Sequence, residues 1–191
     1  VMPPRWLGNL TADCYDVLEY HLQLPREYYQ AGRVSTLTHN VYSHYPLSVE
    51  MLFLLAMCLR GGAYEGMYLA QMMAGLFGAV MVAGVFGGLC GGGEPGRTAA
   101  GRLDSPAGLR AASAVALLAT SPWVVYLSWL AMPELAQMCY LSLALVWLGR
   151  WLDRPAARTA GWVGTMLGCA CAVKYLSVGL AAGPVLAAVS Y

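Results

Sequence analysis

The sequence GMYLAQMMAGLFGAVMVAGVFGGLC, residues 66–90, contains no charged residue. About 20 consecutive apolar residues suffice to cross the hydrocarbon core of a bilayer, so this stretch is long enough to span a membrane. Small residues recur along it, and in a membrane such residues let helices pack closely. They are Ala70, Ala74, Gly75, Gly78, Ala79 and Gly84. The stretch therefore predicts one helix of a packed transmembrane bundle.

Two further apolar stretches predict membrane spans on its C-terminal side. Residues 109–132 form the first, and we expect a bend at Ser121-Pro122 because proline removes a backbone donor and crowds the preceding turn. Residues 134–152 form the second, which opens at Pro133-Glu134. A turn at Asp153-Arg154-Pro155 follows.

The last apolar stretch, residues 159–191, is longer than one ordinary span and is interrupted once, by Lys174. A charged residue in the middle of a single long helix would lie deep in the bilayer, where it is costly. We therefore expect two short spans, at about 159–173 and 176–191, with a break at Lys174-Tyr175.

The first part of the chain, residues 1–65, is different in character, because residues 1–45 are polar, aromatic and rich in acidic residues and histidine. Within it, residues 46–59 are apolar, but about 14 residues are too few to cross a bilayer. A helix lying along the membrane, with Pro46 at its first turn, fits this length. The expected fold is an all-α membrane protein: a multi-pass helical bundle over 66–191, below a loop region that carries membrane-parallel helices.

The composition agrees with this fold. The chain has 191 residues, of which 59% are hydrophobic and only 11% charged, whereas soluble domains carry about 25% charged residues. A net charge of +1 gives no field that would attract nucleic acid, so the expected environment is the lipid bilayer. The six cysteines include no C-x-x-C pair, which argues against a zinc site or a disulfide framework.

The ends of the sequence suggest part of a longer protein. Val1 lies in a polar stretch, and Tyr191 lies inside an apolar one. Because a membrane protein rarely ends within a span, we expect this chain to be a piece of a longer protein, with at least one more span before residue 1.

Two clusters of arginine set the expected orientation. They are Arg97, Arg102 and Arg110 in one loop, and Arg150, Arg154 and Arg158 in the next turn. Two expected spans separate the clusters, so both lie on the same side, and the excess of positive charge makes that side cytoplasmic. Residues 1–65, Glu134 and Lys174 then share the opposite face of a plasma (inner) membrane.

Asp16, Glu19 and His21 place two carboxylates and an imidazole within six residues of that outer region. On a helix, Asp16 and Tyr20 would share a face and Glu19 would adjoin Asp16. A carboxylate there could act as general base toward a hydroxyl group, and carboxylates with imidazoles could hold a divalent cation. The alternative is a polar loop exposed to water.

Glu134 and Lys174 lie at turns embedded in the membrane, where an ionisable group is costly and so suggests a function. A purely structural role is the alternative, in which the two residues cap helix ends or pair with each other. Glu134 lies in the first turn of its expected helix, where a carboxylate suits the helix dipole.

Short motifs, taken in their order along the chain, resemble the early part of a GT-C glycosyltransferase. The similarity is to bacterial family-39-like enzymes, which are related to protein O-mannosyltransferases and to the aminoarabinose transferases of lipid A. The motifs are residues 15–22, 24–25, 31–33, 39–47, 50–52, 121–123, 133–134 and 173–175.

The resemblance implies transfer of a hexosyl or pentosyl group from a polyprenyl-phosphate sugar to an acceptor outside the cytoplasm, with inversion. Asp16 matches the catalytic acidic residue of the first loop, and Glu19 is its neighbour in a region where relatives carry paired acids. Glu134 matches a carboxylate that opens a span, although relatives usually have Asp there. Lys174 matches a basic residue that meets the donor phosphate, as a compact point charge would.

The resemblance also implies a set of substrate-binding residues. Glu50 matches an acidic position before the second helix of the loop. The other expected members are Tyr175, His21, His44 and Tyr45. The sequence admits a divalent metal cation as cofactor, with Glu50, Glu134 and His44 as candidate ligands, and it does not identify the acceptor.

Two other functions compete with a transferase. In a transporter or flippase, Glu134 and Lys174 would line a path through the middle of the membrane. In a non-catalytic membrane scaffold, the polar residues of the loop would have no chemical role.

The expected topology predicts that position 19 is accessible from outside the cytoplasm. In a Glu19→Cys variant, a membrane-impermeant thiol reagent added to intact cells should label the new cysteine. Labelling of position 19 only from the cytoplasmic side would contradict the topology.

Overall fold

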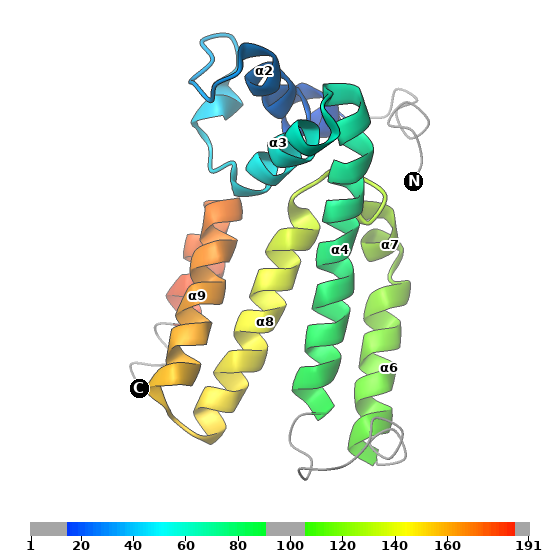
Figure 1. Cartoon of the computed structure of the whole chain (residues 1–191). Helices are drawn as coiled ribbons and strands as arrows, with labels where there is room; N and C mark the ends of the chain where they lie inside the picture. Colours follow the sequence, from blue (N-terminus) through cyan, green and yellow to red (C-terminus); the bar gives the residue numbers. More distant parts are fainter. Residues whose placement is uncertain (1–14, 91–105, 186–191) are drawn as a thin grey trace.

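The described residues of this computed structural model, 15–90 and 106–185, form helices and turns, and no strand occurs among them (Figure 1). Over these residues the chain is all-α, as the sequence predicts. Arg97 and Arg102, which entered the topology argument, lie outside the described residues, as do the end of the expected span 176–191 and the first residues of the loop region.

Four helices lie side by side and are called the bundle below (Figure 1). They are α4 (Ala63–Cys90), α6 (Pro106–Thr120), α8 (Glu134–Asp153) and α9 (Ala157–Val173). Helix α8 contacts both α4 and α9, and α4 also contacts α6. Helices α8 and α9 run in opposite directions because only a short turn joins them, in which Arg154 adopts an extended conformation.

The other described elements of the N-terminal region fold over one end of the bundle and are called the cap (Figure 1). They are η2 (Val17–His21), α2 (Gln23–Ala31), η3 (Val41–His44) and α3 (Ser48–Arg60). Helix α3 corresponds to the apolar stretch 46–59, and it crosses the end of the bundle at an angle to α4. Gly61 ends α3 with a positive φ of 66°, which glycine adopts without strain, and the chain then turns into α4.

The helical structure is interrupted at two places where the sequence predicts a bend or a break. Ser121 is extended, Pro122 begins a separate short helix, α7 (Pro122–Leu127), and residues 128–133 are not helical. The expected span 109–132 is therefore two helices and a turn, because the missing N–H of Pro122 and its ring prevent the first helix from continuing. Lys174 is likewise extended, with φ −145° and ψ 133°, and the chain becomes helical again at residue 176.

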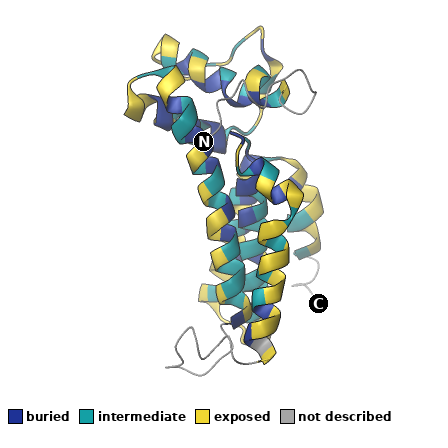
Figure 2. Ribbon diagram, turned by 90° about the vertical axis from the view of Figure 1, so that its right-hand side faces the viewer, coloured by how far each residue is buried: buried dark blue, intermediate teal, exposed yellow. Residues whose placement is uncertain are grey.

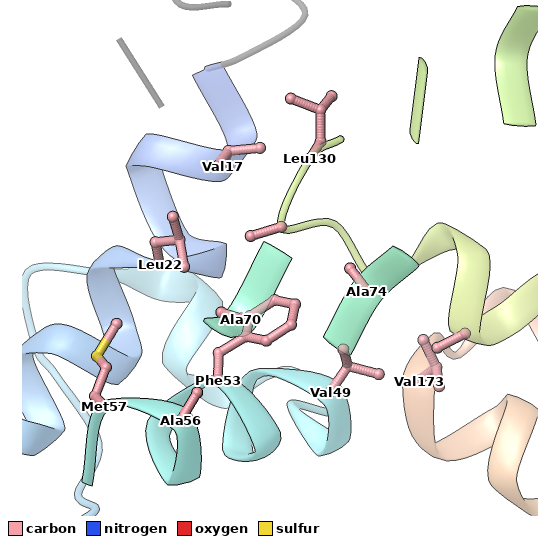
Figure 3. Packing of buried hydrophobic residues seen from close by; sticks show 12 residues of the cluster. Val17, Leu22, Val49, Phe53, Ala56, Met57, Ala70, Ala74, Leu130 and Val173 are labelled. Carbon is pink, nitrogen blue, oxygen red and sulfur yellow. The ribbon is translucent and has the colours of Figure 1, made fainter. Parts of the chain in front are cut away.

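A cluster of buried apolar side chains joins the cap to the bundle and is called the junction cluster (Figure 3). Phe53 is fully buried within it, and Leu22 from the cap and Val173 from the end of α9 pack in the same cluster. Its members are Val17, Leu22, Val49, Phe53, Ala56, Met57, Ala70, Ala74, Leu130, Ala131, Ala136 and Val173. Five separate segments of the chain therefore meet at one place, and this contact fixes how the cap sits on the bundle.

The bundle below the junction buries little of its apolar surface (Figure 2). Helices α4 and α8 are long and apolar enough to cross a membrane, and the most apolar window of each is only 22% buried. Helix α6 carries a shorter apolar stretch, Gly108–Thr120. Large side chains such as Leu76 and Leu145 are more than half exposed.

The end of the bundle opposite the cap carries a group of aromatic and basic side chains. The rings of Trp147 on α8 and Trp162 on α9 stack with their centroids 5.9 Å apart and their planes 19° apart. The guanidinium of Arg150 lies 4.8 Å from the centroid of the Trp147 ring, and it also donates a hydrogen bond to the carbonyl of Gly87. Tryptophan and arginine together are typical of the boundary between apolar and aqueous surroundings.

Helices α3 and α4 approach so closely at Gly66 that a side chain there is predicted to separate them. A Cβ atom on Gly66 would lie 2.4 Å from the Cα atom of Met57, which is a backbone atom and cannot move aside alone. Gly66→Ala should therefore destabilise the protein by about 1–3 kcal/mol, as overpacking does, and lower its unfolding temperature in detergent.

Gly87→Ala is the matched control, because Gly87 lies on the same helix and a Cβ there would meet nothing within 4 Å. It should leave the unfolding temperature unchanged or raise it, since alanine favours the helix by about 0.5–1 kcal/mol. Equal effects of the two substitutions would contradict the close packing at Gly66.

Candidate functional site

A cavity of about 350 Å³ lies between the cap and the upper end of α8 and α9. It is lined by Tyr20, His21, Tyr45, Pro46, Leu47, Glu50, Pro133, Val173, Lys174 and Tyr175. These residues come from four separated segments of the chain. The cavity therefore exists only when the cap is docked.

His21 and Glu50 form a buried pair in the wall of this cavity. His21 is 1% exposed and Glu50 is 2% exposed, and His21 Nδ1 lies 2.5 Å from Glu50 Oε1. The carboxylate accepts this hydrogen bond, so the imidazole donates it through Nδ1–H. The second polar atom of each side chain, His21 Nε2 and Glu50 Oε2, is buried and makes no hydrogen bond within the described part of the chain.

The junction cluster holds the backbone on either side of this pair. Leu22, directly after His21, and Val49, directly before Glu50, both belong to the cluster (Figure 3). His21 ends the π-helix η2, which Leu22 closes by donating its backbone N–H to the carbonyl of Val17 at 3.0 Å. Single π-turns of this kind occur frequently at functional sites.

Lys174 and Glu134 form a second pair, a salt bridge in which Lys174 Nζ donates to Glu134 Oε1. The pair is partly exposed, with 34% of the Lys174 side chain and 23% of the Glu134 side chain accessible. Glu134 is the first residue of α8, and Lys174 directly follows the end of α9. The pairing that the sequence left open as a structural alternative is thus present, while Lys174 also lines the cavity.

This second pair also has a polar atom that makes no hydrogen bond within the described part of the chain. Glu134 Oε2 is buried without a hydrogen bond from any described residue. The ammonium group of lysine has three donors, and Glu134 Oε1 takes one of them. The segment after the break at Lys174 is held to α8 by a hydrogen bond of 2.8 Å from Gln137 Nε2 to Ser177 Oγ.

A row of tyrosine rings borders the cavity. Tyr20 stacks on Tyr42 with centroids 4.1 Å apart, Tyr42 meets Tyr45 edge to face at 5.5 Å, and Tyr45 lies 6.5 Å from Tyr175. Partial burial raises the pKa of the Tyr20 phenol above its ordinary value, and the nearby carboxylates of Asp16, Glu134 and Glu50 raise it further. Tyr20 therefore stays protonated and can donate a hydrogen bond into a region of negative charge.

The structure brings some of the expected site residues together and leaves others apart. His21, Tyr45, Glu50, Lys174 and Tyr175 line the cavity, and Glu134 is joined to it through Lys174.

Asp16, Glu19 and His44 do not line the cavity. Asp16 directly precedes η2 and Glu19 lies within it, and both side chains are partly buried. The backbone carbonyl of Glu19 accepts a hydrogen bond from Asn40 Nδ2 at 3.1 Å. His44 is exposed, and its Nδ1 lies 3.3 Å from the carbonyl of Val41.

The candidate metal ligands do not form a coordination group. Across residues 15–90 and 106–185, no three histidine, cysteine, aspartate or glutamate side chains are placed to hold one ion. One oxygen of Glu50 bonds to His21, and one oxygen of Glu134 bonds to Lys174. The Nδ1 atom of His44 lies against the carbonyl of Val41 in its own turn. We therefore derive no chemical step through a metal.

Sequence reasoning missed two residues that shape the site. Tyr20 lines the cavity, and its ring lies against that of His21 with the centroids 4.0 Å apart and the planes tilted by 47°. Asn40 is buried, accepts a hydrogen bond from the backbone N–H of Tyr42, and so caps η3 while its amide group holds Glu19. Its signal in the sequence was an asparagine directly before a short aromatic turn, which is a common capping position.

No protein-family model, curated protein or solved structure matches this chain.

Because the His21–Glu50 pair is buried, we predict that replacing one member lowers the stability of the protein more than replacing both. Glu50→Leu leaves a buried imidazole N–H without an acceptor, and a buried donor left unpaired costs about 1–3 kcal/mol. The double variant His21→Leu/Glu50→Leu should recover much of the lost stability, since two apolar groups then fill the same space. Unfolding temperatures in detergent, measured for the wild type, the single variant and the double variant, test this ranking of stability.

The exposed pair of His39 and Glu27, with His39 Nε2 and Glu27 Oε2 2.9 Å apart, is the matched control. His39→Leu should cost only about 0–1 kcal/mol, because water solvates the partner that remains. A Glu50→Leu effect as small as this one would show that the His21–Glu50 pair is not buried.

Proposed function

We propose that this chain is part of a membrane glycosyltransferase that moves a sugar from a polyprenyl-phosphate donor to an extracytoplasmic acceptor, with inversion. The observation that carries the proposal is the cavity at the end of the apolar bundle. There a lysine, a buried imidazole–carboxylate pair and tyrosine rings meet at one place. A lipid-linked sugar needs this combination: an apolar surface for its tail, a cation for its phosphate and polar groups for its sugar.

The exposed apolar surface of the bundle supports a membrane location. A core helix of a water-soluble protein would be mostly buried, whereas the apolar windows of α4 and α8 are only 22% buried. Such a large exposed apolar surface would cause aggregation in water, but it is the normal outer surface of a bundle in lipid.

The distribution of basic residues supports the proposed orientation. Arg110, at the start of α6, and Arg150, Arg154 and Arg158, around the turn between α8 and α9, lie at the end of the bundle opposite the cap (Figure 1). The end with more positive charge is expected to face the cytoplasm. In the plasma (inner) membrane, the cavity would then face away from it.

The cavity offers a place for each part of the donor. Lys174 keeps two ammonium donors beyond its bond to Glu134, and these can bind the oxygens of a phosphate. The tyrosines Tyr45 and Tyr175 present ring faces and hydroxyl groups to a sugar. The phosphate is a good leaving group, so an acceptor hydroxyl can displace it directly, and direct displacement inverts the anomeric centre.

A transporter is less well supported, because the Glu134–Lys174 pair lies at helix ends. Glu134 begins α8 and Lys174 follows the end of α9, so neither residue lies along the middle of the bundle where a transport path would run. Four buried side-chain polar atoms of the described residues have no partner, and three of them belong to the residues of the two pairs: His21 Nε2, Glu50 Oε2 and Glu134 Oε2. A purely structural scaffold would not need unpaired atoms gathered in this way.

The proposal predicts that the protein transfers sugar from at least one polyprenyl-phosphate sugar in membranes, and that Lys174→Met abolishes the transfer. The loss should be about 100-fold or more, as expected for a group that stabilises charge on the leaving phosphate. Transfer is measured with radiolabelled donors of different sugars, at matched protein levels.

Arg26→Met is the control, because it also removes a positive charge but at an exposed position on α2, a helix of the cap that contributes no residue to the cavity wall. It should leave transfer unchanged. Absence of transfer by the wild type from every donor would contradict the proposed function, and full activity of Lys174→Met would contradict the phosphate site.

A further inference from the structure

The buried imidazole of His21 has one nitrogen committed and one nitrogen unused. Nδ1 donates to Glu50 Oε1 at 2.5 Å, and Nε2 is buried without a hydrogen bond in the described residues. His21 also lines the cavity. A buried polar atom without a partner is rare in folded proteins, and beside a cavity it points to a ligand group that it would meet.

We propose that His21 is the catalytic base of the transfer reaction, and that Glu50 is the residue that positions it. This proposal rests on the proposed function, and it assigns to His21 the role that the family resemblance gives to Asp16.

The contact with Glu50 determines which nitrogen can accept a proton. A carboxylate only accepts hydrogen bonds, so the proton of a neutral imidazole stays on Nδ1 and the lone pair is on Nε2. Tyr20, with its ring centroid 4.0 Å from that of His21, further limits rotation of the imidazole. The junction cluster fixes the backbone on both sides through Leu22 and Val49.

Glu50 is the charged group that touches His21. Glu50 on α3 contacts it directly and would stabilise the imidazolium, as the carboxylate does in a catalytic triad. The other ionisable groups in the cavity wall are Lys174 and the phenols of Tyr20, Tyr45 and Tyr175. Beside the wall lie Glu134, which pairs with Lys174, and Asp16, whose carboxylate is near Tyr20. Glu50 is thus the carboxylate in direct contact with the imidazole.

The carboxylates near the cavity are less suited to this role. Asp16 does not line the cavity, and Glu134 is held by Lys174. A base must lie within hydrogen-bond reach of the proton that it removes, and the unused Nε2 of His21 belongs to a side chain in the cavity wall.

The step is a displacement with one proton transfer. The O–H bond of the acceptor breaks and its proton moves to His21 Nε2, while the acceptor oxygen forms a bond to the anomeric carbon. The bond from that carbon to the phosphate oxygen breaks, and its electron pair leaves with the polyprenyl phosphate. The imidazolium then returns its proton to water.

The tautomer of His21 can be measured without any substrate. In ¹⁵N-histidine NMR of the full-length protein in lipid nanodiscs, the His21 signals are assigned by their loss in His21→Gln. We expect a protonated Nδ1 and an unprotonated Nε2 in the neutral ring, and in Glu50→Gln we expect this preference to be lost. A wild-type ring protonated at Nε2 would overturn the proposal whether or not the protein transfers sugar.

Transfer kinetics test the role of the base. His21→Ala should reduce kcat by about 100-fold or more, with little change in KM for the donor, and added imidazole should restore part of the activity. His39→Gln, which changes the exposed histidine paired with Glu27, should be fully active. Rescue by imidazole distinguishes a missing base from a misfolded protein.

The outcomes separate this proposal from the proposed function. Transfer by the wild type together with full activity of His21→Ala would overturn the base and leave the transferase in place. Loss of activity in His21→Ala without rescue, together with loss in Asp16→Asn, would return the role of the base to Asp16. No transfer from any polyprenyl-phosphate sugar would overturn the proposed function and the role of the base with it.

Discussion

The contact between the cap and the bundle is the interaction on which the rest of the structure depends. Phe53 is fully buried at this contact, among side chains from η2, α3, α4, the turn before α8 and the end of α9 (Figure 3). Burial of apolar side chains stabilises by about 25 cal/mol per Å² of surface removed from water, and here that stabilisation is concentrated where polar residues must be held. Leu22, Val49 and Val173 are members of the cluster, and each is the direct chain neighbour of a residue in the cavity wall. The same packing that docks the cap thus builds the site.

The site brings together buried polar groups whose removal from water costs folding free energy. A buried imidazole and carboxylate must be taken out of water, and their attraction offsets this cost only when the geometry is good and the other polar atoms are satisfied. Three polar atoms there make no hydrogen bond with any described residue. Features of this kind collect at functional sites, where local stability is given up for chemistry. The two pairs differ, however, since the His21–Glu50 pair is buried and the Lys174–Glu134 pair is partly exposed.

The helices and their interruptions could be predicted from the sequence because they depend on local features. The length of the apolar stretch predicted α4, and Pro122 predicted the end of α6. The single lysine in the last apolar stretch predicted the break after α9. The arrangement of the cap could not be predicted in the same way, because it depends on which apolar side chains meet across five segments.

The helical register explains why Asp16 and Glu19 do not line the cavity. With an ordinary helix, Asp16 and Tyr20 would share a face, and the cluster of Asp16 and Glu19 would look like the centre of the site. The π-turn over Val17–His21 adds one residue to that turn and changes which side chains face inward, so Tyr20 and His21 line the cavity instead. No feature of the sequence marks a π-turn. The partnership of His21 with Glu50, 29 residues away, was likewise beyond any local pattern.

The stacked tryptophans at the far end of α8 have a consequence for the membrane that this protein would need. Helix α8 has 20 residues, which at 1.5 Å per residue gives a length of about 30 Å, close to the thickness of a bilayer core. Trp147 and Arg150 mark one end of this length, and Glu134 marks the other. In a bilayer, the length of α8 would therefore set the distance between the cavity and the opposite membrane surface. In the proposed membrane location, a thicker bilayer would draw the cavity into hydrocarbon and a thinner one would lift it into water, so the proposed function would require one lipid thickness.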